Sequence, residues 1–545
     1  MVIRLVAVAV SVAVLSTAAL WAATIGATGR DDHSYGAAEA DSLVGGGGDR
    51  LLYGLGGNVA LDGGLRRAAL LGAASGGRIA RVRGVDASRC GPGRVAIRAR
   101  LVDRAASRCV SLVRRLSRDS LSDAGAQHET EVEPAAAAWG QTVVAAFQVG
   151  RFAGGGGAAG IGFATSPDGG RSWRSGFLPE LTIYSHPPGG AAAASDPSVA
   201  FDAVHREWLI SSLVATPEGV GAAVSRSRDG LTWSRPVLAA VSSGDLDKEW
   251  LACDSWTSSP FRGHCYLSYL DVAANQIATR TSVDGGRTWS IQEAPPGAPP
   301  PTIVNGAQPV VRPDGTLVVL YMSLDPLSEL DGDLLAVRST DGGASFSSPT
   351  RAARVRLENV YELRSPALPA ASVDASGRLY VVWQDCRFTD QCQTVDLVLS
   401  SSADGLNWSA PRRIPTTVPS ALTPSVVPGF AVDPTTSGRS ARLGLVFDTV
   451  SEGCVPYPYC VSVDAYLTSS PDGGASWSHP ERLNAQTMPV AWIADGGIGA
   501  MVGDYQAVAF AHGTPIPVVS LASKPAPDST FRQAIYAGVP PQRPG

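Results

Sequence analysis

The chain has 545 residues, of which 17% are charged, and its formal net charge at pH 7 is -5. This balance gives no reason to expect nucleic acid as a partner, because a phosphate-binding surface needs clustered lysine and arginine side chains. The 60 glycines and 39 prolines are typical of a fold built from many short strands and turns.

Residues 1–29 are predicted to be a targeting segment. Arg4 precedes an uncharged stretch from Leu5 to Gly29 that is rich in alanine, valine and leucine. Small residues near its end fit cleavage as a signal peptide, and the stretch is also long enough to remain as a membrane anchor. Both interpretations place the rest of the chain outside the cytoplasm, secreted or attached to the membrane through this segment only.

Residues 30–125 differ from the rest of the chain. A run of four glycines, Gly45–Gly48, lies within glycine- and alanine-rich stretches, which predicts a linker. The end of this region is predicted to be a small segment stapled by a disulfide.

The eight cysteines fall into close pairs along the chain, and we expect four local disulfides. The pairs are Cys90 with Cys109, Cys253 with Cys265, Cys386 with Cys392, and Cys454 with Cys460. The connectivity cannot be proven from sequence. Because no CxxC motif occurs and the seven histidines are scattered, we expect neither a metal site nor another cofactor.

From residue 126 onward a short motif with aspartate, glycine and an aromatic residue occurs six times, as in SPDGGRSW (Ser166–Trp173). An Asp-Gly pair between two extended runs signals a hairpin. The aspartate can accept hydrogen bonds within its own turn, the glycine can adopt a positive φ, and the aromatic ring can pack between strands. The aspartates are Asp168, Asp229, Asp284, Asp341, Asp404 and Asp472, and the tryptophans are Trp173, Trp233, Trp289, Trp408 and Trp477.

Each repeat also contains regular strand-like runs. One example opens with Asp196–Asp202, continues with Glu207–Leu213 and reaches the next motif through a third run. Four strands per repeat of about 60 residues correspond to one blade of a β-propeller. We therefore expect an all-β fold over residues 126–539, a β-propeller of four-stranded antiparallel blades.

The number of blades depends on the end of the chain. Three further strand-like runs, Gly503–Gly513, Thr514–Ser523 and Phe531–Val539, follow the sixth motif and carry no motif themselves. The segment before residue 133 can supply a fourth strand and so pair the two chain ends. The repeat spacing favours seven blades over six.

The six motifs resemble the Asp-box (BNR) repeats of the sialidase-like superfamily. Stretches such as His128–Pro134 and Val502–Ala507 are similar to those of bacterial secreted sialidase-like proteins. Sialidases hold the sialic acid carboxylate with clustered arginines and use a tyrosine nucleophile with acidic residues. The resemblance therefore implies a glycan-related function, while a seventh blade and the lack of a recognisable arginine cluster separate the chain from that pattern.

In propellers the first strand of each blade lines the central channel, so candidate site residues lie near the blade openings. The candidate catalytic residues are Asp196, Asp247, Asp504 and Tyr505, and the candidate substrate-binding residues are Arg151, Arg364, Glu133 and Glu249. Asp245 and Asn305 are further polar residues near these openings. An aspartate at the start of a strand also commonly caps a turn, which is the structural alternative for these positions.

The sequence thus favours a monomeric, exported propeller that binds glycans or proteins as a scaffold of the cell envelope. The alternative is a glycoside hydrolase of the exo-α-sialidase type that cleaves terminal sugars of extracellular glycans. The motif aspartates are expected to be structural, because their hydrogen bonds are used within the hairpin turns.

Overall fold

The computed structural model divides the chain into two units, Met1–Leu112 and Val113–Gly545, which are described separately. In the first unit it describes the strands alone. In the second it describes residues 113–540 apart from 122–124, 296–301, 328–329, 359, 361, 417–422, 455–456 and 529, and the side chains of 452–460. Residues 1–23, which hold most of the predicted targeting segment, lie outside the described residues, as do Cys90 and Cys109.

The first unit contains parallel strands where the sequence predicted a linker. One sheet has the order β1 (Thr24–Gly26), β3 (Ser42–Val44), β5 (Ala60–Asp62), β7 (Gly77–Val82) and β9 (Val95–Ala99). The other has β2 (Asp32–Tyr35), β4 (Arg50–Tyr53), β6 (Ala68–Leu71) and β8 (Ala87–Arg89). Strands that alternate between two parallel sheets are typical of a solenoid. Ser42 pairs with Ala60, and Ala60 pairs with Arg78, so equivalent strand residues recur at a constant spacing. This spacing is the feature of the glycine-rich stretch from which the parallel strands could have been predicted.

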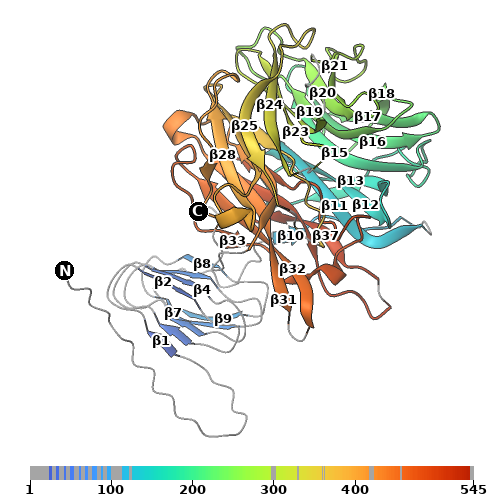
Figure 1. Ribbon diagram of the computed structural model, residues 1–545. Coiled ribbons are helices and arrows are strands. Elements are labelled where there is room, and N and C mark those ends of the chain that lie inside the picture. Colours follow the sequence, from blue (N-terminus) through green and yellow to red (C-terminus); the bar gives the residue numbers. More distant parts are fainter. Residues whose placement is uncertain are drawn as a thin grey trace. The chain divides into compact units, whose positions relative to one another are not determined.

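The second unit consists of consecutive sets of antiparallel strands (Figure 1). The first two sets are β11 (Ala126–Trp139), β12 (Thr142–Phe152), β13 (Ala158–Ser166) and β14 (Arg174–Phe177), then β15 (Ala193–Asp202), β16 (Glu207–Thr216), β17 (Gly219–Ser227) and β18 (Val237–Val241). The next two are β19 (Leu246–Cys253), β20 (Cys265–Asp271) and β21 (Gln276–Ser282), then β22 (Ile303–Val311), β23 (Leu317–Leu324), β24 (Asp331–Ser339) and β25 (Thr350–Arg356).

The later sets continue the pattern. They are β26 (Ala370–Val373), β27 (Leu379–Asp385), β28 (Asp396–Ser402) and β29 (Arg412–Arg413), then β30 (Ser425–Val432), β31 (Leu443–Cys454), β32 (Tyr457–Ser470), β33 (Glu481–Arg482) and β34 (Met488–Pro489), and finally β35 (Ala507–Ala511), β36 (Thr514–Ala522) and β37 (Gln533–Gly538). Short 3-10 turns lie at Asp390–Cys392, Gly438–Ser440 and Val490–Trp492. The described part of this unit is thus all-β, as the sequence predicted.

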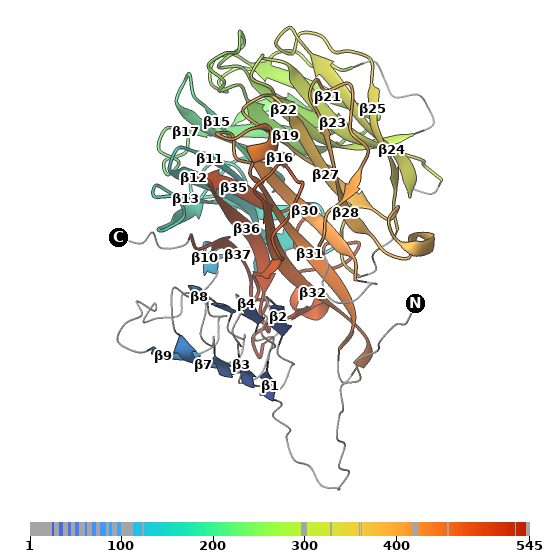
Figure 2. The same ribbon diagram turned by 90° about the vertical axis from the view of Figure 1, so that its left-hand side faces the viewer.

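The first strand of each set contacts the first strand of the next. Contacts join β11 to β15, β15 to β19, β19 to β22, β22 to β26, β26 to β30, β30 to β35, and β35 back to β11. Figure 2 shows the last strands, in red, beside the cyan strands of the first set. The strand β10 (Val113–Arg115) pairs antiparallel with β37, so the unit begins at Val113 and not at the predicted residue 126.

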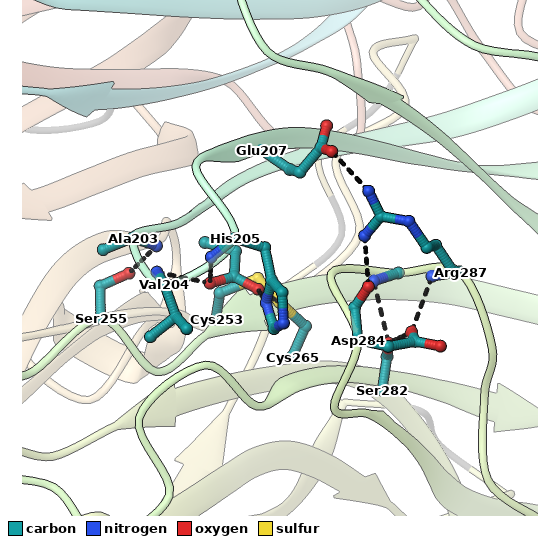
Figure 3. Close-up of polar contacts among 12 residues, drawn as sticks. Ala203, Val204, His205, Glu207, Cys253, Ser255, Cys265, Ser282, Asp284 and Arg287 are labelled. Atoms are coloured by element: carbon teal, nitrogen blue, oxygen red, sulfur yellow. Dashed lines mark hydrogen bonds and ion pairs between the residues drawn. A yellow bond between two sulfur atoms is a disulfide. The ribbon is translucent and has the colours of Figure 1, made fainter.

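The motif aspartates accept hydrogen bonds within their own turns. Asp284 accepts from the Ser282 hydroxyl and from the main-chain N–H of Arg287, both at 2.9 Å (Figure 3). It also accepts from the main-chain N–H of Thr288 at 2.9 Å and from the Thr288 hydroxyl at 2.7 Å. Burial alone raises the pKa of Asp284, but these hydrogen bonds lower it to about 2. Hydrogen bonds within the turn also lower the pKa of the other five motif aspartates.

The motif also joins neighbouring sets. The Arg287 guanidinium donates to Glu207 of β16 at 2.8 Å (Figure 3). Gly286 has φ +79°, and a Cβ at this position would lie 2.5 Å from Cδ2 of Leu209 on β16. The glycine therefore serves close packing between sets as well as the turn itself, which the sequence did not predict.

The motif tryptophans are less buried than the sequence suggested. Trp233 is 7% exposed, whereas Trp173, Trp289, Trp408 and Trp477 are half-buried. The half-buried rings pack against the hydrophobic clusters and remain partly exposed to solvent.

Two of the four predicted disulfides are confirmed. Cys253 and Cys265, which face each other on β19 and β20, form one, and Cys386 and Cys392 form the other. The side chains of Cys454 and Cys460 lie outside the described residues.

Candidate functional site

The first strands carry β-bulges at matching positions. Glu133, Asp196 and Lys248 have φ values of 53°, 50° and 43°, and the strand register shifts around each of them. Gly306 and Val427 occupy the corresponding positions of β22 and β30. Left-handed backbone is unfavourable for residues other than glycine, and bulges re-aim side chains. The charged bulge residues fall on three consecutive sets.

A cavity of about 370 Å³ opens beside these bulges. Its charged lining consists of Glu133, Arg151, Asp196, Asp245, Asp247 and Arg364. Five of the eight residues predicted for the site therefore line one cavity, together with Asp245. They come from β11, β12, β15 and β19 and from the segment before β26, so residues far apart in the sequence meet there.

One wall is a continuous hydrogen-bonded chain. Arg151 Nη1 donates to Gln148 Oε1 at 3.1 Å, and Gln148 Nε2 donates to Glu133 Oε2. The main-chain N–H of Asp504 donates to Glu133 Oε1 at 3.1 Å. Arg364 holds the Asp504 carboxylate from Nε at 2.6 Å and from Nη2 at 2.5 Å. Gln148 was not predicted as a site residue. Its position as a polar residue within the apolar run of β12 could have indicated a role in the site.

This series of hydrogen bonds changes the role expected for Arg364. Its guanidinium is balanced by the bidentate pair with Asp504, so it is not free to hold an anionic substrate. Of the two predicted anion binders, only Arg151 has no carboxylate partner among the described ion pairs.

The opposite wall carries Asp196 and Asp247. Asp247 accepts from the Asn305 amide and from the main-chain N–H of Lys248, both at 2.9 Å. Burial, together with the nearby charges of Asp247 and Asp504, raises the pKa of Asp196 to about 6. Burial and the charges of Asp196 and Asp504 also raise the pKa of Glu133 well above its ordinary value. The cavity thus combines carboxyl groups of different proton affinity.

Lys248 and Tyr505 are buried and do not belong to the lining of the cavity. The Lys248 amine lies 3.8 Å from the centre of the Trp250 ring and 4.7 Å from that of Tyr505, and burial lowers its pKa to about 8. The Tyr505 hydroxyl donates to the Pro197 carbonyl at 2.9 Å. Burial and the charge of Glu133 raise the pKa of Tyr505 well above its ordinary value. A buried phenol with this bond is a poor nucleophile, which argues against the predicted role.

Glu249 also lies away from the cavity lining. Its side chain is fully buried, and the Ser211 hydroxyl donates to Oε2 at 2.7 Å. Burial raises the pKa of Glu249 to about 8. Because Lys248 occupies the bulge, its neighbour Glu249 is directed into the packed interior, so direct contact of Glu249 with a ligand is not supported.

Within the described residues, no group of three or more histidine, cysteine, aspartate or glutamate side chains is arranged to hold a metal ion. No helix in that part of the chain is long and apolar enough to cross a membrane.

No family model and no curated protein matches this sequence. Among solved structures, the Hadza microbial sialidase Hz136 is 14% identical with a TM-score of 0.37, and the match covers 76% of this chain and 66% of that one. The NanB sialidase from Streptococcus pneumoniae is 12% identical over 81% of this chain and 73% of its own, with a TM-score of 0.38. An ulvan lyase of polysaccharide lyase family PL25 is 11% identical over 76% and 96%, with a TM-score of 0.46.

Proposed function

We propose that residues 113–540 form a seven-bladed β-propeller whose cavity binds a glycan at the cell envelope. The blade count is supported by the successive antiparallel sets and by the cyclic contacts of their first strands. The pairing of β10 with β37 supports closure of the ring through the two ends of the unit. Export is supported by the two disulfides, since disulfides persist in oxidising compartments.

The observation that carries the binding function is the charged cavity at the bulges. Its volume of about 370 Å³ lies within the range of about 300–1,000 Å³ typical of small-ligand pockets. Ionised carboxylates accept hydrogen bonds from sugar hydroxyls, and an arginine donates to sugar oxygens. Bulge residues held in unfavourable backbone conformations are frequent at functional sites, which adds to this interpretation.

The cavity fits a neutral or cationic sugar better than an anionic one. Three aspartates and Glu133 line it, and one of its two arginines is already paired with Asp504. The exo-α-sialidase alternative requires clustered arginines free to hold a carboxylate, so we do not favour that substrate.

Hydrolysis of a glycan is the second candidate function. It is favoured by one observation, the raised pKa of Asp196 in the same cavity as Asp247. A glycosidase needs one carboxylic acid that donates a proton to the leaving oxygen and one carboxylate that acts as base or nucleophile. Asp196 would be the acid and Asp247 the carboxylate.

The binding function is tested by a glycan array with the purified protein and with the Asp196→Asn and Asp247→Asn variants. We expect glycan binding by the wild type and its loss in both variants. Asp333→Asn, which removes a carboxylate of β24 paired with Arg351, is the matched control and should bind normally. If the wild type binds no glycan, the proposed function is wrong.

A release assay on a panel of oligosaccharides separates the two functions. Sugar release by the wild type that both Asp196→Asn and Asp247→Asn abolish, and that Asp333→Asn leaves unchanged, would establish the hydrolase. Binding without release would leave the protein as a recognition module.

A further inference from the structure

The cavity is unevenly charged once its internal pairs are taken into account. Asp196, Asp245 and Asp247 face two arginines, and Arg364 is held by Asp504, while burial raises the pKa of Glu133 well above its ordinary value, so that Glu133 is not counted as a charge. The Asp504 carboxylate adds a further negative charge next to the lining. An entering ligand therefore meets a surface with an excess of negative charge.

The carboxylates on the β19 side have unused acceptor capacity. Asp247 accepts two hydrogen bonds, whereas two carboxylate oxygens offer about four acceptor sites. Asp245 is exposed, and among the described residues no side chain or main-chain group donates to its carboxylate. A cationic donor entering the cavity would therefore find acceptors on Asp245 and Asp247.

Arg151 supplies an independent indication of a ligand. It lines the same cavity and is only 3% exposed. Its Nη1 donates to Gln148, but its Nε finds no acceptor among the described residues. A buried donor without an acceptor is costly, so a ligand oxygen at this position would be stabilising.

We propose that the ligand is a glycan with a free amino group, whose ammonium binds Asp196, Asp245 and Asp247 while a hydroxyl or ring oxygen accepts from Arg151. This inference rests on the proposed glycan-binding function and specifies its ligand class. An ammonium group has three donors and no acceptor, which matches the three carboxylates. Charge-assisted hydrogen bonds of this kind are about twice as strong as neutral ones.

The amine should also make binding depend on pH. Asp196 is faced by the carboxyl groups of Asp247, Asp504, Glu133 and Glu249 and by the Lys248 amine. Below about pH 6 Asp196 takes up a proton and the cavity loses negative charge. The contribution of Asp196 to amino-glycan affinity, measured as the ratio of affinities of the wild type and Asp196→Asn, should therefore shrink between pH 7 and pH 5.

The test is calorimetric titration of the full chain with three tetrasaccharides. They are β-1,4-linked tetramers of glucosamine, N-acetylglucosamine and glucose, which differ only in the group at C2. We expect the glucosamine tetramer to bind at least about tenfold more tightly than the other two at pH 7. Added salt should reduce this preference, because it screens the ammonium–carboxylate attraction.

Variants then test which residues cause the preference for the glucosamine tetramer. Asp245→Asn and Asp247→Asn should each reduce the preference for the amine, and Asp333→Asn should leave it unchanged. Arg151→Gln should weaken all three tetramers to a similar degree. Because Asp245 is exposed, Asp245→Asn is expected to fold. It therefore still tests the proposal if Asp247→Asn fails to fold.

The possible results distinguish the amine inference from the proposed glycan-binding function. Equal affinity for the three tetramers would overturn the amine inference and leave glycan binding intact, and so would an amine preference that survives Asp245→Asn and Asp247→Asn. A titration with calcium chloride that shows saturable binding, together with no amine preference, would identify the carboxylates as a cation site instead. Failure of all three tetramers in the titration, with no glycan bound on the array, would overturn both proposals.

Discussion

The aspartates of the hairpin turns and those of the first-strand bulges behave in opposite ways. In the turns, Asp284 accepts hydrogen bonds from its own neighbours, and its pKa falls to about 2. In the bulges, Asp196 lies among other carboxylates, and its pKa rises to about 6. The turn aspartates stabilise the fold, whereas the bulge residue Asp196 is held at a cost to it. A cost of this kind is common where a group serves function.

The largest expected effect belongs to the turn motif. Trp233→Ala should lower the free energy of unfolding by about 3–5 kcal/mol, because a buried aromatic ring leaves a cavity. Trp289→Ala should lower it by about half as much, since the Trp289 ring is only half-buried. Guanidinium unfolding measures both variants. Equal losses would mean that the exposure of the rings does not determine their contribution.

The buried carboxyl groups predict how stability changes with pH. The pKa of Asp196 rises to about 6, and burial raises the pKa values of Glu131, Glu249 and Asp448 to about 8. In the unfolded chain such groups release their protons near pH 4. Because the folded state keeps these protons longer, stability should fall as pH rises from 5 to 8.

The turn aspartates act at the other end of the pH scale. Their lowered pKa values give stability that is complete above about pH 4 and is lost as pH falls toward 2. We therefore expect maximal stability near pH 5 in denaturant titrations across this range. Stability that is flat or rises from pH 5 to pH 8 would show that the buried carboxyls are not protonated in the fold.

A third prediction tests the contact between neighbouring sets. Gly286→Ala should destabilise the fold by about 2–3 kcal/mol, because the added methyl group meets Leu209 and the backbone has a positive φ. Gly140 also has a positive φ, of 62°, but has no atom within 4 Å of an added Cβ. Gly140→Ala should therefore cost only about 1 kcal/mol. Equal costs would remove the proposed packing role of the motif glycine.

The strands of the second unit could be predicted because each repeat contains the local sequence features of strands and turns. Asp-Gly turns and alternating apolar runs located the strands of the second unit, including β35, β36 and β37, which have no motif. The parallel strands of the first unit could not be recognised, because their signal is a spacing within a glycine- and alanine-rich stretch and not a hydrophobic pattern.

The cavity residues could be predicted in position but not in pairing. Asp196 and Asp247 were found because they lie near strand openings. The pair between Arg364 and Asp504 joins two connecting segments that lie 140 residues apart in the sequence, and no local pattern predicts it. The burial of Glu249 depends on which side the bulge at Lys248 turns, and that of Tyr505 depends on its packing against Trp250. Both are features of tertiary packing.

The smallest predicted effect contrasts the two kinds of aspartate directly. Asp196→Asn should stabilise the protein at pH 7 by about 1 kcal/mol, because it removes a charge that the fold disfavours, and the gain should vanish near pH 4. Asp284→Asn should destabilise it by about 1 kcal/mol through weaker hydrogen bonds in the turn. Thermal unfolding at both pH values measures the two variants. The same sign for both would contradict the division between the two kinds of aspartate.

The central claim is that the carboxylate-lined cavity beside the bulges is the ligand site. A crystal structure of the protein soaked with the glucosamine tetramer tests it most directly. We predict a sugar residue in this cavity, with its nitrogen within hydrogen-bond distance of Asp196 or Asp247 and a sugar oxygen against Arg151. A tetramer bound only elsewhere, such as in the outer groove lined by Arg351, Arg354 and Arg356, would contradict the claim.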